Sequence, residues 1–228
     1  MTRPLVLFGT AEIAELARFY FEHDSEYRVV AFTVDDAYVD CDQFLGLPVV
    51  PFSEVGTRFS PETNELHVAL SYSKLNRLRQ EKYFQAKTAG YRLASYISTK
   101  STIWPGLVVG DNCFILENQC LQPDIRLGSN VVLWSGNHIG HGSVIGDHTY
   151  ISSHVVISGH CEIGERCFFG VNATIKDFTR IGDECFIGMA ASVTLDMASG
   201  SVAVGESARI FPPEDRIARA LKKKYFKI

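Results

Sequence analysis

The segment HIGHGSVIGDHTYISSHVVISGHCEIG, residues 138–164, carries the pattern that decides the fold. An aliphatic residue returns at every sixth position of this segment, and the period continues without a slip from Ile97 to Val193. All seventeen positions of the series are apolar, and Phe169 is the one member that is not aliphatic. Such a regular period indicates a repeat architecture, because each short unit can bury its apolar side chain only by stacking on its neighbours.

A second period of eighteen residues lies on top of the first. A glycine followed by a polar or acidic residue occurs at Gly110, Gly128, Gly146, Gly164 and Gly182. Three hexapeptides therefore form one coil, and residues eighteen apart should stack at the strand spacing of about 4.8 Å. We expect these glycines to occupy corners that need unusual backbone angles.

The residue two places before each aliphatic position should also face the interior of the coil, where room is short. Most of these residues are small, and four of the six cysteines are among them, so we interpret these four as buried thiols. Together the two periods predict a left-handed parallel β-helix over residues 97–211, an exception to the usual right-handed crossover. A prism of this kind has flat exposed faces, so we expect a homotrimer. The four inward cysteines are Cys113, Cys161, Cys167 and Cys185.

The N-terminal part, residues 1–96, has the pattern of an α/β domain. An apolar strand is expected at residues 4–8, followed by a glycine turn, an amphipathic helix and a second strand over Tyr27–Val34 that ends in two aspartates. This order is that of a Rossmann-like nucleotide-binding unit, and the alternative is a packing module that binds no ligand. The candidate nucleotide-contacting residues are Gly9, Thr10, Ala11, Asp35 and Asp36.

Two further segments flank the repeats. A strand over residues 66–71 and a charged helix over residues 74–89 should precede them. After them, Pro212-Pro213 breaks the chain, and residues 212–228 should contain a short C-terminal helix. The run Lys222-Lys223-Lys224 matches the helix dipole; we interpret it as a solvated helix end, with a phosphate site as the alternative.

Composition restricts the classes of function. The chain has 228 residues, of which 46% are hydrophobic, so it can bury a proper core. The formal net charge of −4 argues against a general binder of nucleic acid or anionic membranes. The start, MTRPLVLFGT, has too short an apolar run for a signal peptide, and no run reaches the length of a membrane span. We therefore expect a cytoplasmic protein.

Five of the seven histidines fall within residues 138–160, which raises the question of a metal site. His148, His154 and His160 are six residues apart, so they lie on different sides of the coil and cannot share a metal within one chain. We expect no metal. His141 follows an inward aliphatic residue just past a corner and is the best-placed basic imidazole, with a purely structural role as the alternative. His138 is either the alternative to His141 as the basic imidazole or a residue that supports the site.

The chain resembles the sugar acetyltransferase family that includes sialic acid O-acetyltransferases and UDP-4-amino-sugar N-acetyltransferases. The motifs that carry the resemblance are HGSVIGDH around His141, SSHVVISGHCEIGE in the next coil, and IGMAASVTLD followed by VGESARI. Members pair a small Rossmann-like N-terminal domain with a hexapeptide-repeat β-helix, so the resemblance covers nearly the whole chain. In the closing motif, Glu206-Ser207 stands where the family usually has Asn-Pro.

The resemblance implies a site. By this similarity His141 is the general base, and Gly159, eighteen residues on, offers the amide that faces the acetyl carbonyl. Acetyl-coenzyme A would be the acyl donor, lying in a groove between neighbouring prisms, and the N-terminal turn and aspartates would hold the nucleotide of a nucleotide-sugar substrate. The residues that map onto the coenzyme A groove are Gly159, Val171, Met189, Ala190 and Arg209.

Two departures from the family pattern stand out. The segment GTAEIAE replaces the family's Gly-Gly-His-Gly-type loop. Gly142 stands where many relatives carry an acidic residue that orients the base. As a hypothesis, Asp124, eighteen residues before Gly142, supplies that carboxylate from the neighbouring coil.

The expected reaction is N-acetylation of a nucleotide-linked amino sugar for surface glycans such as lipopolysaccharide, by direct attack on the thioester. A sugar O-acetyltransferase with the same site is the second hypothesis, and a non-catalytic β-helical scaffold is the third. An amine acceptor, protonated at neutral pH, predicts a steeper rise in activity towards about pH 8–9 than a hydroxyl acceptor does. Cysteine is not expected as a nucleophile, because the coil cysteines point inward.

Overall fold

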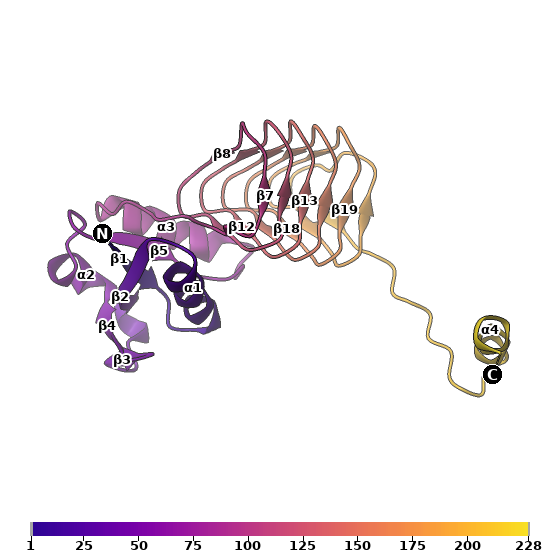
Figure 1. Cartoon of the computed structure of the whole chain (residues 1–228), viewed down its shortest axis with the longest axis horizontal. Coiled ribbons are helices and arrows are strands. Elements are labelled where there is room, and N and C mark those ends of the chain that lie inside the picture. Colours follow the sequence, from indigo (N-terminus) through magenta and orange to yellow (C-terminus); the bar gives the residue numbers. More distant parts are fainter. Residues whose placement is uncertain (1, 228) are drawn as a thin grey trace.

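The computed structural model describes residues 2–227 and contains an N-terminal α/β unit, a long β-helix and a separate C-terminal helix (Figure 1). The N-terminal sheet has the strand order β3-β4-β2-β1-β5, and all of its pairs are parallel except β3 with β4. Its parallel strands read as continuous apolar runs because helices cover both faces. The elements are β1 (Arg3–Phe8), α1 (Glu12–His23), β2 (Tyr27–Val34), η1 (Asp36–Tyr38), β3 (Gln43–Phe44), β4 (Leu47–Pro51), α2 (Phe52–Arg58), β5 (Glu65–Val68) and α3 (Arg77–Thr88).

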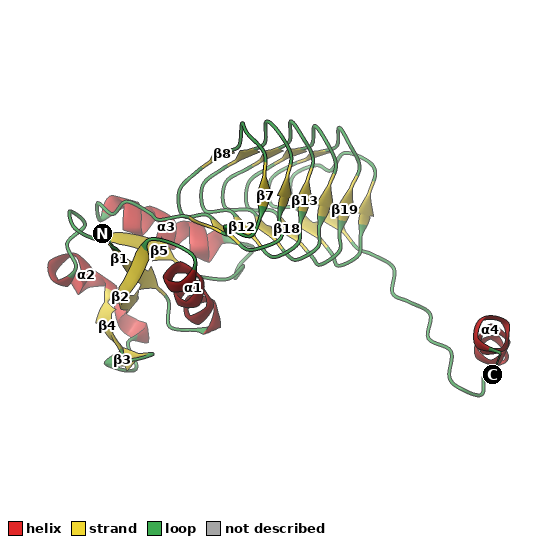
Figure 2. Cartoon of the chain, viewed as in Figure 1, coloured by secondary structure: helices red, strands yellow, loops and turns green. Residues whose placement is uncertain are grey.

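The repeats form three parallel sheets, which are the three faces of a prism (Figure 2). The first face has β6 (Tyr96–Ile97), β9 (Phe114–Ile115), β12 (Val132–Leu133), β15 (Tyr150–Ile151), β18 (Phe168–Phe169), β21 (Phe186–Ile187) and β23 (Val202–Ala203). The second face has β7 (Thr102–Ile103), β10 (Cys120–Leu121), β13 (His138–Ile139), β16 (Val156–Ile157), β19 (Thr174–Ile175) and β22 (Ser192–Val193). The third face has β8 (Val108–Val109), β11 (Arg126–Leu127), β14 (Val144–Ile145), β17 (Glu162–Ile163) and β20 (Arg180–Ile181).

The register of these sheets is the one that the eighteen-residue period predicts. His138 pairs with Val156 and Ile139 with Ile157, and the same offset holds from β6 to β22. The three parallel sheets and the hexapeptide period fit a left-handed parallel β-helix behind an N-terminal α/β unit. The first corner of the prism lies between the first and second faces, the second corner between the second and third, and the third corner between the third and first.

The corners are made differently from what the glycine pattern suggests. The glycines that follow the aliphatic residues do not have positive φ; a Cβ on Gly128 would lie 2.2 Å from the Asp147 carboxylate of the next coil. Glycine is needed there because the coils approach closely. The left-handed residue comes two places later, and between 112 and 190 it recurs every six residues. These left-handed positions are Asn112, Asn118, Asp124, Asn130, Gly136, Gly142, His148, His154, His160, Arg166, Asn172, Phe178, Glu184 and Ala190.

The prism interior is a continuous aliphatic core. Its sixfold series from Ile115 to Val193 is buried throughout, and the four inward cysteines are completely buried free thiols, as predicted. Burial raises the pKa of the Cys113 and Cys167 thiols to about 12 each, because the thiolate would lose its hydration. These cysteines are therefore packing residues and not nucleophiles.

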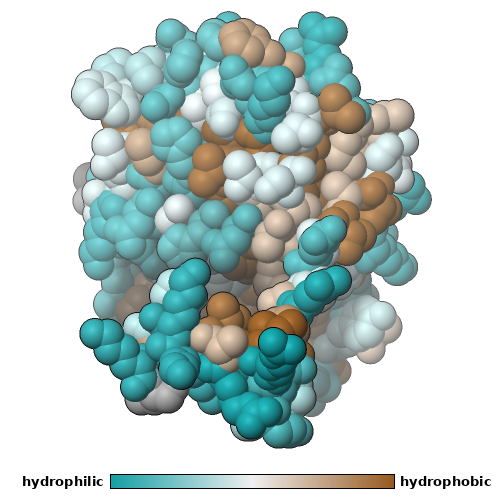
Figure 3. All heavy atoms as spheres, turned by 90° about the vertical axis from the view of Figure 1, so that its right-hand side faces the viewer, coloured by the Kyte–Doolittle hydropathy of each residue, from teal (hydrophilic) through white to brown (hydrophobic). Residues whose placement is uncertain are grey.

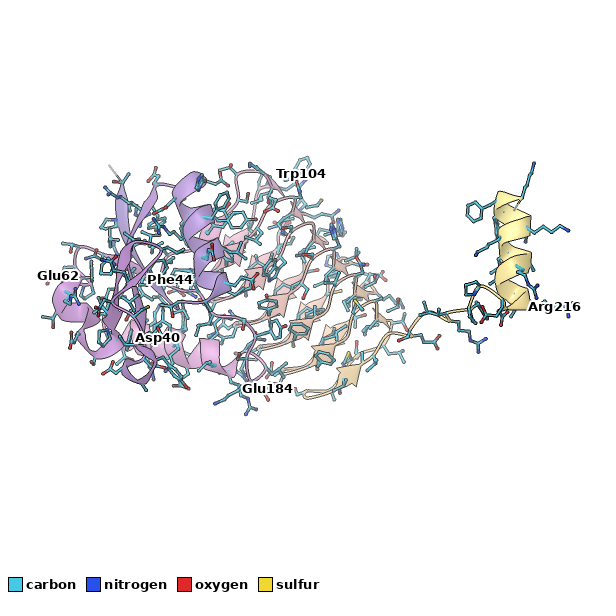
Figure 4. All side chains as sticks on the ribbon, turned by 90° about the horizontal axis from the view of Figure 1, so that it is seen from below. Asp40, Phe44, Glu62, Trp104, Glu184 and Arg216 are labelled. Carbon is cyan, nitrogen blue, oxygen red and sulfur yellow. The ribbon has the colours of Figure 1, made fainter. Side chains whose placement is uncertain are left out.

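Helix α3 fastens the α/β unit to the third corner of the prism. The buried guanidinium of Arg79 donates to the carbonyl oxygens of Asn130 and His148, and the Asn76 amide donates to the Cys167 carbonyl at 3.0 Å. An ion pair of 2.6 Å between Arg77 and Glu184 extends this contact towards the last coils. Figure 4 labels Glu184 at this edge of the prism. Because these hydrogen bonds are buried and specific, the α/β unit is held in one position against the first face.

The C-terminal segment leaves the prism after β23. Residues 204–212 form no helix or strand, and a turn follows at residues 213–214. The last helix, α4 (Arg216–Phe226), is capped by Asp215, whose carboxylate accepts from the Ile217 amide at 2.6 Å. The helix lies apart from the prism, and its lysine run is exposed to solvent (Figure 1). Apolar and strongly hydrophilic side chains alternate on the end of the molecule that carries α4 (Figure 3). Within residues 2–227, no helix has the length and apolar character that crossing a membrane requires.

Candidate active site

His141 lies at the second corner of the prism, two residues after the buried Ile139 of β13. Burial of Ile139 anchors the strand, so the chain turns outward immediately after it and leaves the imidazole exposed. The left-handed Gly142 that follows has a φ of 65° and completes the turn.

Gln122 of the preceding coil holds both the backbone and the ring of His141. Its side-chain oxygen Oε1 lies 2.9 Å from the His141 amide nitrogen and 2.9 Å from Nδ1. An Nδ1–H that donates to this oxygen leaves Nε2 with a free lone pair, which is the tautomer that a general base needs.

Gly159 of the next coil lies directly over the other side of the ring. A Cβ at this position would be 2.9 Å from His141 Cε1 and 3.2 Å from Nε2, so only glycine leaves enough room for the imidazole. The Gly159 amide N–H donates to no acceptor within residues 2–227. The same Cβ would lie 3.3 Å from Nδ1, so Gly159 faces the Cε1 edge of the ring, and its backbone donor belongs to the residue next to the imidazole, as an oxyanion site requires.

Two aromatic side chains continue the second corner beyond His141. The His160 ring meets the His141 ring edge-on at 4.8 Å, and the Phe178 ring stacks on His160 at 5.1 Å. Phe178 is 68% exposed and has a φ of 58°, an unusual conformation for a bulky residue. Neither residue was singled out from the sequence for this site; the eighteen-residue register that places His160 beside Gly142 was the available signal.

Asp124 does not make the contact that the sequence suggested for it. Its left-handed backbone, with a φ of 63°, directs the carboxylate towards Gly106 of the preceding coil, where Oδ1 would be 2.7 Å from a Cβ. Within residues 2–227 it forms no hydrogen bond to His141, and Gln122 occupies that role instead. His138 lies on β13 beside Cys120 and Val156, and no contact with the His141 ring is present in the described chain.

A groove of about 940 Å³ lies on the other side of the second face, at the first corner. One wall comes from the start of α1 and the loop after β5, with Ala11 and Tyr72. The other wall is the first face, where Tyr150, Phe168 and Phe186 form a ladder of stacked rings. The structure thus gathers Ala11, predicted for the nucleotide sugar, with two residues predicted for coenzyme A. These two are Val171 and Met189.

The other predicted binding residues are dispersed. Gly9 ends β1 with a φ of 129°, and a Cβ there would lie 2.9 Å from the Ala69 carbonyl oxygen, so the turn needs glycine. Asp35 forms an ion pair of 2.8 Å with the buried Lys82, and the Asp36 carboxylate accepts from the Ser53 hydroxyl at 2.6 Å. Arg209 lies on the exposed tail, away from the groove.

Thr10 and Ala190 complete the predicted set. Thr10 is partly buried between Gly9 and the exposed Ala11, and Ala190 is a left-handed residue of the first corner, directly after the groove residue Met189. As for metals, residues 2–227 contain no group of three or more His, Cys, Asp or Glu side chains that could hold an ion.

Comparison with known proteins agrees with this architecture. Residues 124–159 match the family described as bacterial transferase hexapeptide (six repeats), and residues 162–194 and 178–210 match the hexapeptide repeat of succinyl-transferase. The repeat region of the chain is therefore similar to hexapeptide-repeat transferases. No curated protein has a sequence that matches this chain.

Solved structures narrow the resemblance. The acetyltransferase domain of PglB from Neisseria gonorrhoeae FA1090 superposes with a TM-score of 0.79 at 22% identity, covering 92% of this chain and 100% of that one. PerB from Caulobacter crescentus, in complex with CoA and GDP-perosamine, has a TM-score of 0.79 at 22% identity, covering 91% and 97%. WeeI from Acinetobacter baumannii AYE has a TM-score of 0.56 at 20% identity, covering 92% and 100%. At this identity the likeness establishes the shared fold, and the predicted resemblance to sugar acetyltransferases is confirmed at that level.

Proposed function

We propose that this chain is an acetyl-CoA-dependent N-acetyltransferase that acts on a nucleotide-linked amino sugar in surface glycan biosynthesis. The observation that carries the proposal is the pairing of His141, held through Nδ1 by Gln122, with Gly159, which lies against the same ring and whose amide has no acceptor within residues 2–227. The shared fold supports it, since PerB was solved with CoA and GDP-perosamine and the PglB domain is an acetyltransferase.

The proposed chemistry needs few groups because a thioester is already activated. Nε2 of His141 removes a proton from the amine as the amine nitrogen attacks the thioester carbon. The resulting oxyanion accepts a hydrogen bond from the Gly159 amide, and loss of such a donor in other acyl transfers costs about 3 kcal/mol. The intermediate then expels coenzyme A as a thiolate, which takes the proton back from the imidazolium. The amide product and free coenzyme A leave with all protons accounted for.

The binding region that we propose is the groove at the first corner. Its size, its aromatic ladder and its position at the carboxyl end of β1 are typical of ligand sites next to parallel sheets. We propose that the nucleotide sugar and the coenzyme occupy this groove and its continuation towards a neighbouring prism. Since His141 lies at the second corner, a complete site would combine the groove of one subunit with the imidazole of another, as in a homotrimer.

A direct assay tests the proposal. The purified protein is incubated with acetyl-CoA and a panel of GDP-, UDP- and dTDP-linked 4-amino sugars, and free coenzyme A thiol is measured. We expect turnover with at least one amino sugar, and His141→Ala should lower kcat by about a hundred- to ten-thousand-fold. The control is His23→Ala, a surface histidine of α1 that should leave kcat unchanged.

Three outcomes would overturn parts of the proposal. Absence of any thermal shift at millimolar acetyl-CoA would favour a non-catalytic scaffold. Turnover of sugars with a free hydroxyl in place of the amine, with a shallow pH dependence, would indicate an O-acetyltransferase. Full activity of His141→Ala would remove this residue as the base.

A further inference from the structure

We infer that Gln122 is the positioning residue of the site. Its neutral side chain determines which ring nitrogen of His141 carries the lone pair, a role that a carboxylate could also fill. This inference rests on the proposed function, because it concerns the histidine proposed as the base. It goes beyond that proposal by assigning a role to a residue in a different coil, nineteen positions away in the sequence.

The hydrogen bonds determine the orientation of the glutamine amide. A backbone N–H can only donate, so the atom of Gln122 that lies 2.9 Å from the His141 amide nitrogen must be the carbonyl oxygen. The same oxygen lies 2.9 Å from Nδ1, and an oxygen can only accept. In the neutral ring Nδ1 must therefore carry the hydrogen, and Nε2 carries the lone pair.

The glutamine itself is held firmly. It directly follows Leu121 of β10, which is completely buried, and the backbone N–H of Gln122 donates to the Ile139 carbonyl at 3.1 Å. The next residue, Pro123, accepts a hydrogen bond of 3.1 Å from the Gly142 amide. Two consecutive residues of one coil thus hold His141 and Gly142 of the next, and the backbone from which the Gln122 side chain reaches the ring is fixed.

A neutral partner has a different consequence from a charged one. Both align the ring, but a carboxylate would also stabilise the imidazolium after proton transfer. Among residues 2–227, the titratable group in contact with the ring is His160, whose ring lies 4.8 Å away; Asp124, two residues after Gln122, does not bond to it. A Gln122→Glu variant would therefore place the first carboxylate against Nδ1–H.

Three variants test this inference: Gln122→Ala, Gln122→Glu and, as a matched control, Gln43→Ala, an exposed glutamine of the N-terminal unit. We expect Gln122→Ala to lower kcat by about 10- to 100-fold with KM unchanged, because outer partners of functional histidines have effects of this size. Gln122→Glu should keep most of the wild-type kcat and move the acidic limb of the pH–rate profile to higher pH. The pH–rate profile of His160→Asn is measured as well. If the acidic limb persists without this neighbouring imidazole, the limb belongs to His141.

A second measurement does not depend on turnover. Long-range proton–nitrogen correlation spectra of protein with ¹⁵N-labelled histidine report which ring nitrogen carries the hydrogen. We expect the Nδ1–H tautomer for His141 in the wild type and in Gln43→Ala, and loss of this preference in Gln122→Ala. If His141→Ala is inactive while Gln122→Ala keeps the wild-type tautomer, kcat and pH profile, this inference is wrong and the proposed function stands. If His141→Ala is fully active, the proposed function fails first.

Discussion

At the scale of single residues, the site depends on the absence of a side chain as much as on the presence of one. His141 occupies the space that a Cβ on Gly159 would enter, and Gln122 holds the ring from the opposite side. The imidazole therefore lies between two coils, and its contacts with Gln122 and Gly159 fix the position of its Nε2 atom. Confinement of this kind matters because a displacement of about 1 Å can cost roughly 100-fold in rate.

The first prediction follows from this contact. Gly159→Ala would place a methyl group 2.9 Å from Cε1 of His141, so the ring must move. We expect kcat to fall by roughly 100-fold with little change in melting temperature, because both residues lie at an open corner. Gly56→Ala in α2 is the control, since a Cβ there meets nothing within 4 Å. Normal kcat in Gly159→Ala would show that the ring is not confined as described.

At the scale of elements, the stacked third corner joins the β-helix to α3. Asn112, Asn130 and His148 are consecutive left-handed residues of this corner, and all three are buried. The side-chain nitrogen Nδ2 of Asn130 lies 2.9 Å from Nδ1 of His148 and donates to it, so this ring is held in its neutral form. Burial, and secondly the guanidinium of Arg79, lower the pKa of His148 to about 4.

This corner predicts a loss of stability in acid. In the unfolded chain a histidine binds a proton near pH 6.5, whereas folded His148 binds it only near pH 4. The unfolded state therefore gains protons first as the pH falls, and the free energy of unfolding decreases between about pH 6.5 and 4. His148→Asn keeps a residue that tolerates left-handed angles and removes this titration.

Urea unfolding at pH 7.5 and pH 5 measures the effect. We expect the decrease in unfolding free energy between these pH values to be smaller by about 2 kcal/mol in His148→Asn than in the wild type. His154→Asn is the matched control, because it makes the same change at an exposed left-handed position. Equal pH dependence in all three proteins would contradict a neutral, buried His148. The wild-type dependence also contains His67, whose pKa burial lowers to about 4.

At the scale of the whole molecule, the groove and the proposed base lie at different corners of one prism. The groove is bounded by the α/β unit and the first face, whereas His141 follows the second face. The junction through Arg79 and Asn76 holds the α/β unit in place, so a hinge motion within one chain is not the expected way to join them. Closed rotational symmetry would bring the two corners of neighbouring subunits together.

Subunit complementation tests this arrangement. His141→Ala removes the base, and Ala11→Trp fills the groove next to an exposed residue, so each variant alone should be inactive. When the two are co-expressed in equal amounts, about a quarter of the sites would pair an intact groove with an intact histidine from a neighbour. We expect about a quarter of wild-type activity in the whole co-expressed population, homotrimers included. No recovery in mixed oligomers, with the mixing shown by differential tags, would mean that each chain carries a complete site.

Much of the molecule follows from local sequence rules. The sixfold apolar series from Ile97 to Val193 determined the coil length, the register of the prism strand pairs from β6 to β22 and the burial of Cys113, Cys161, Cys167 and Cys185. It did so because a two-residue strand can bury its apolar side chain only in one stacking register. The hypothesis that Asp124 supplies a carboxylate to His141 finds no contact in the structure, because a rule for backbone stacking does not say where a side chain reaches.

What the sequence alone determined is thus the repeating scaffold, the place of His141 at a corner, and Gly159 one coil further on. Only the tertiary structure decided that Gln122, and not Asp124, contacts the imidazole, because the left-handed turn at Asp124 directs its carboxylate to Gly106. Only the tertiary structure, likewise, brought Ala11 of the N-terminal unit beside Val171 and Met189, since that groove depends on how two separately folded layers pack. Periodicity specifies contacts within a repeat; contacts between side chains of different lengths and between layers depend on packing in three dimensions.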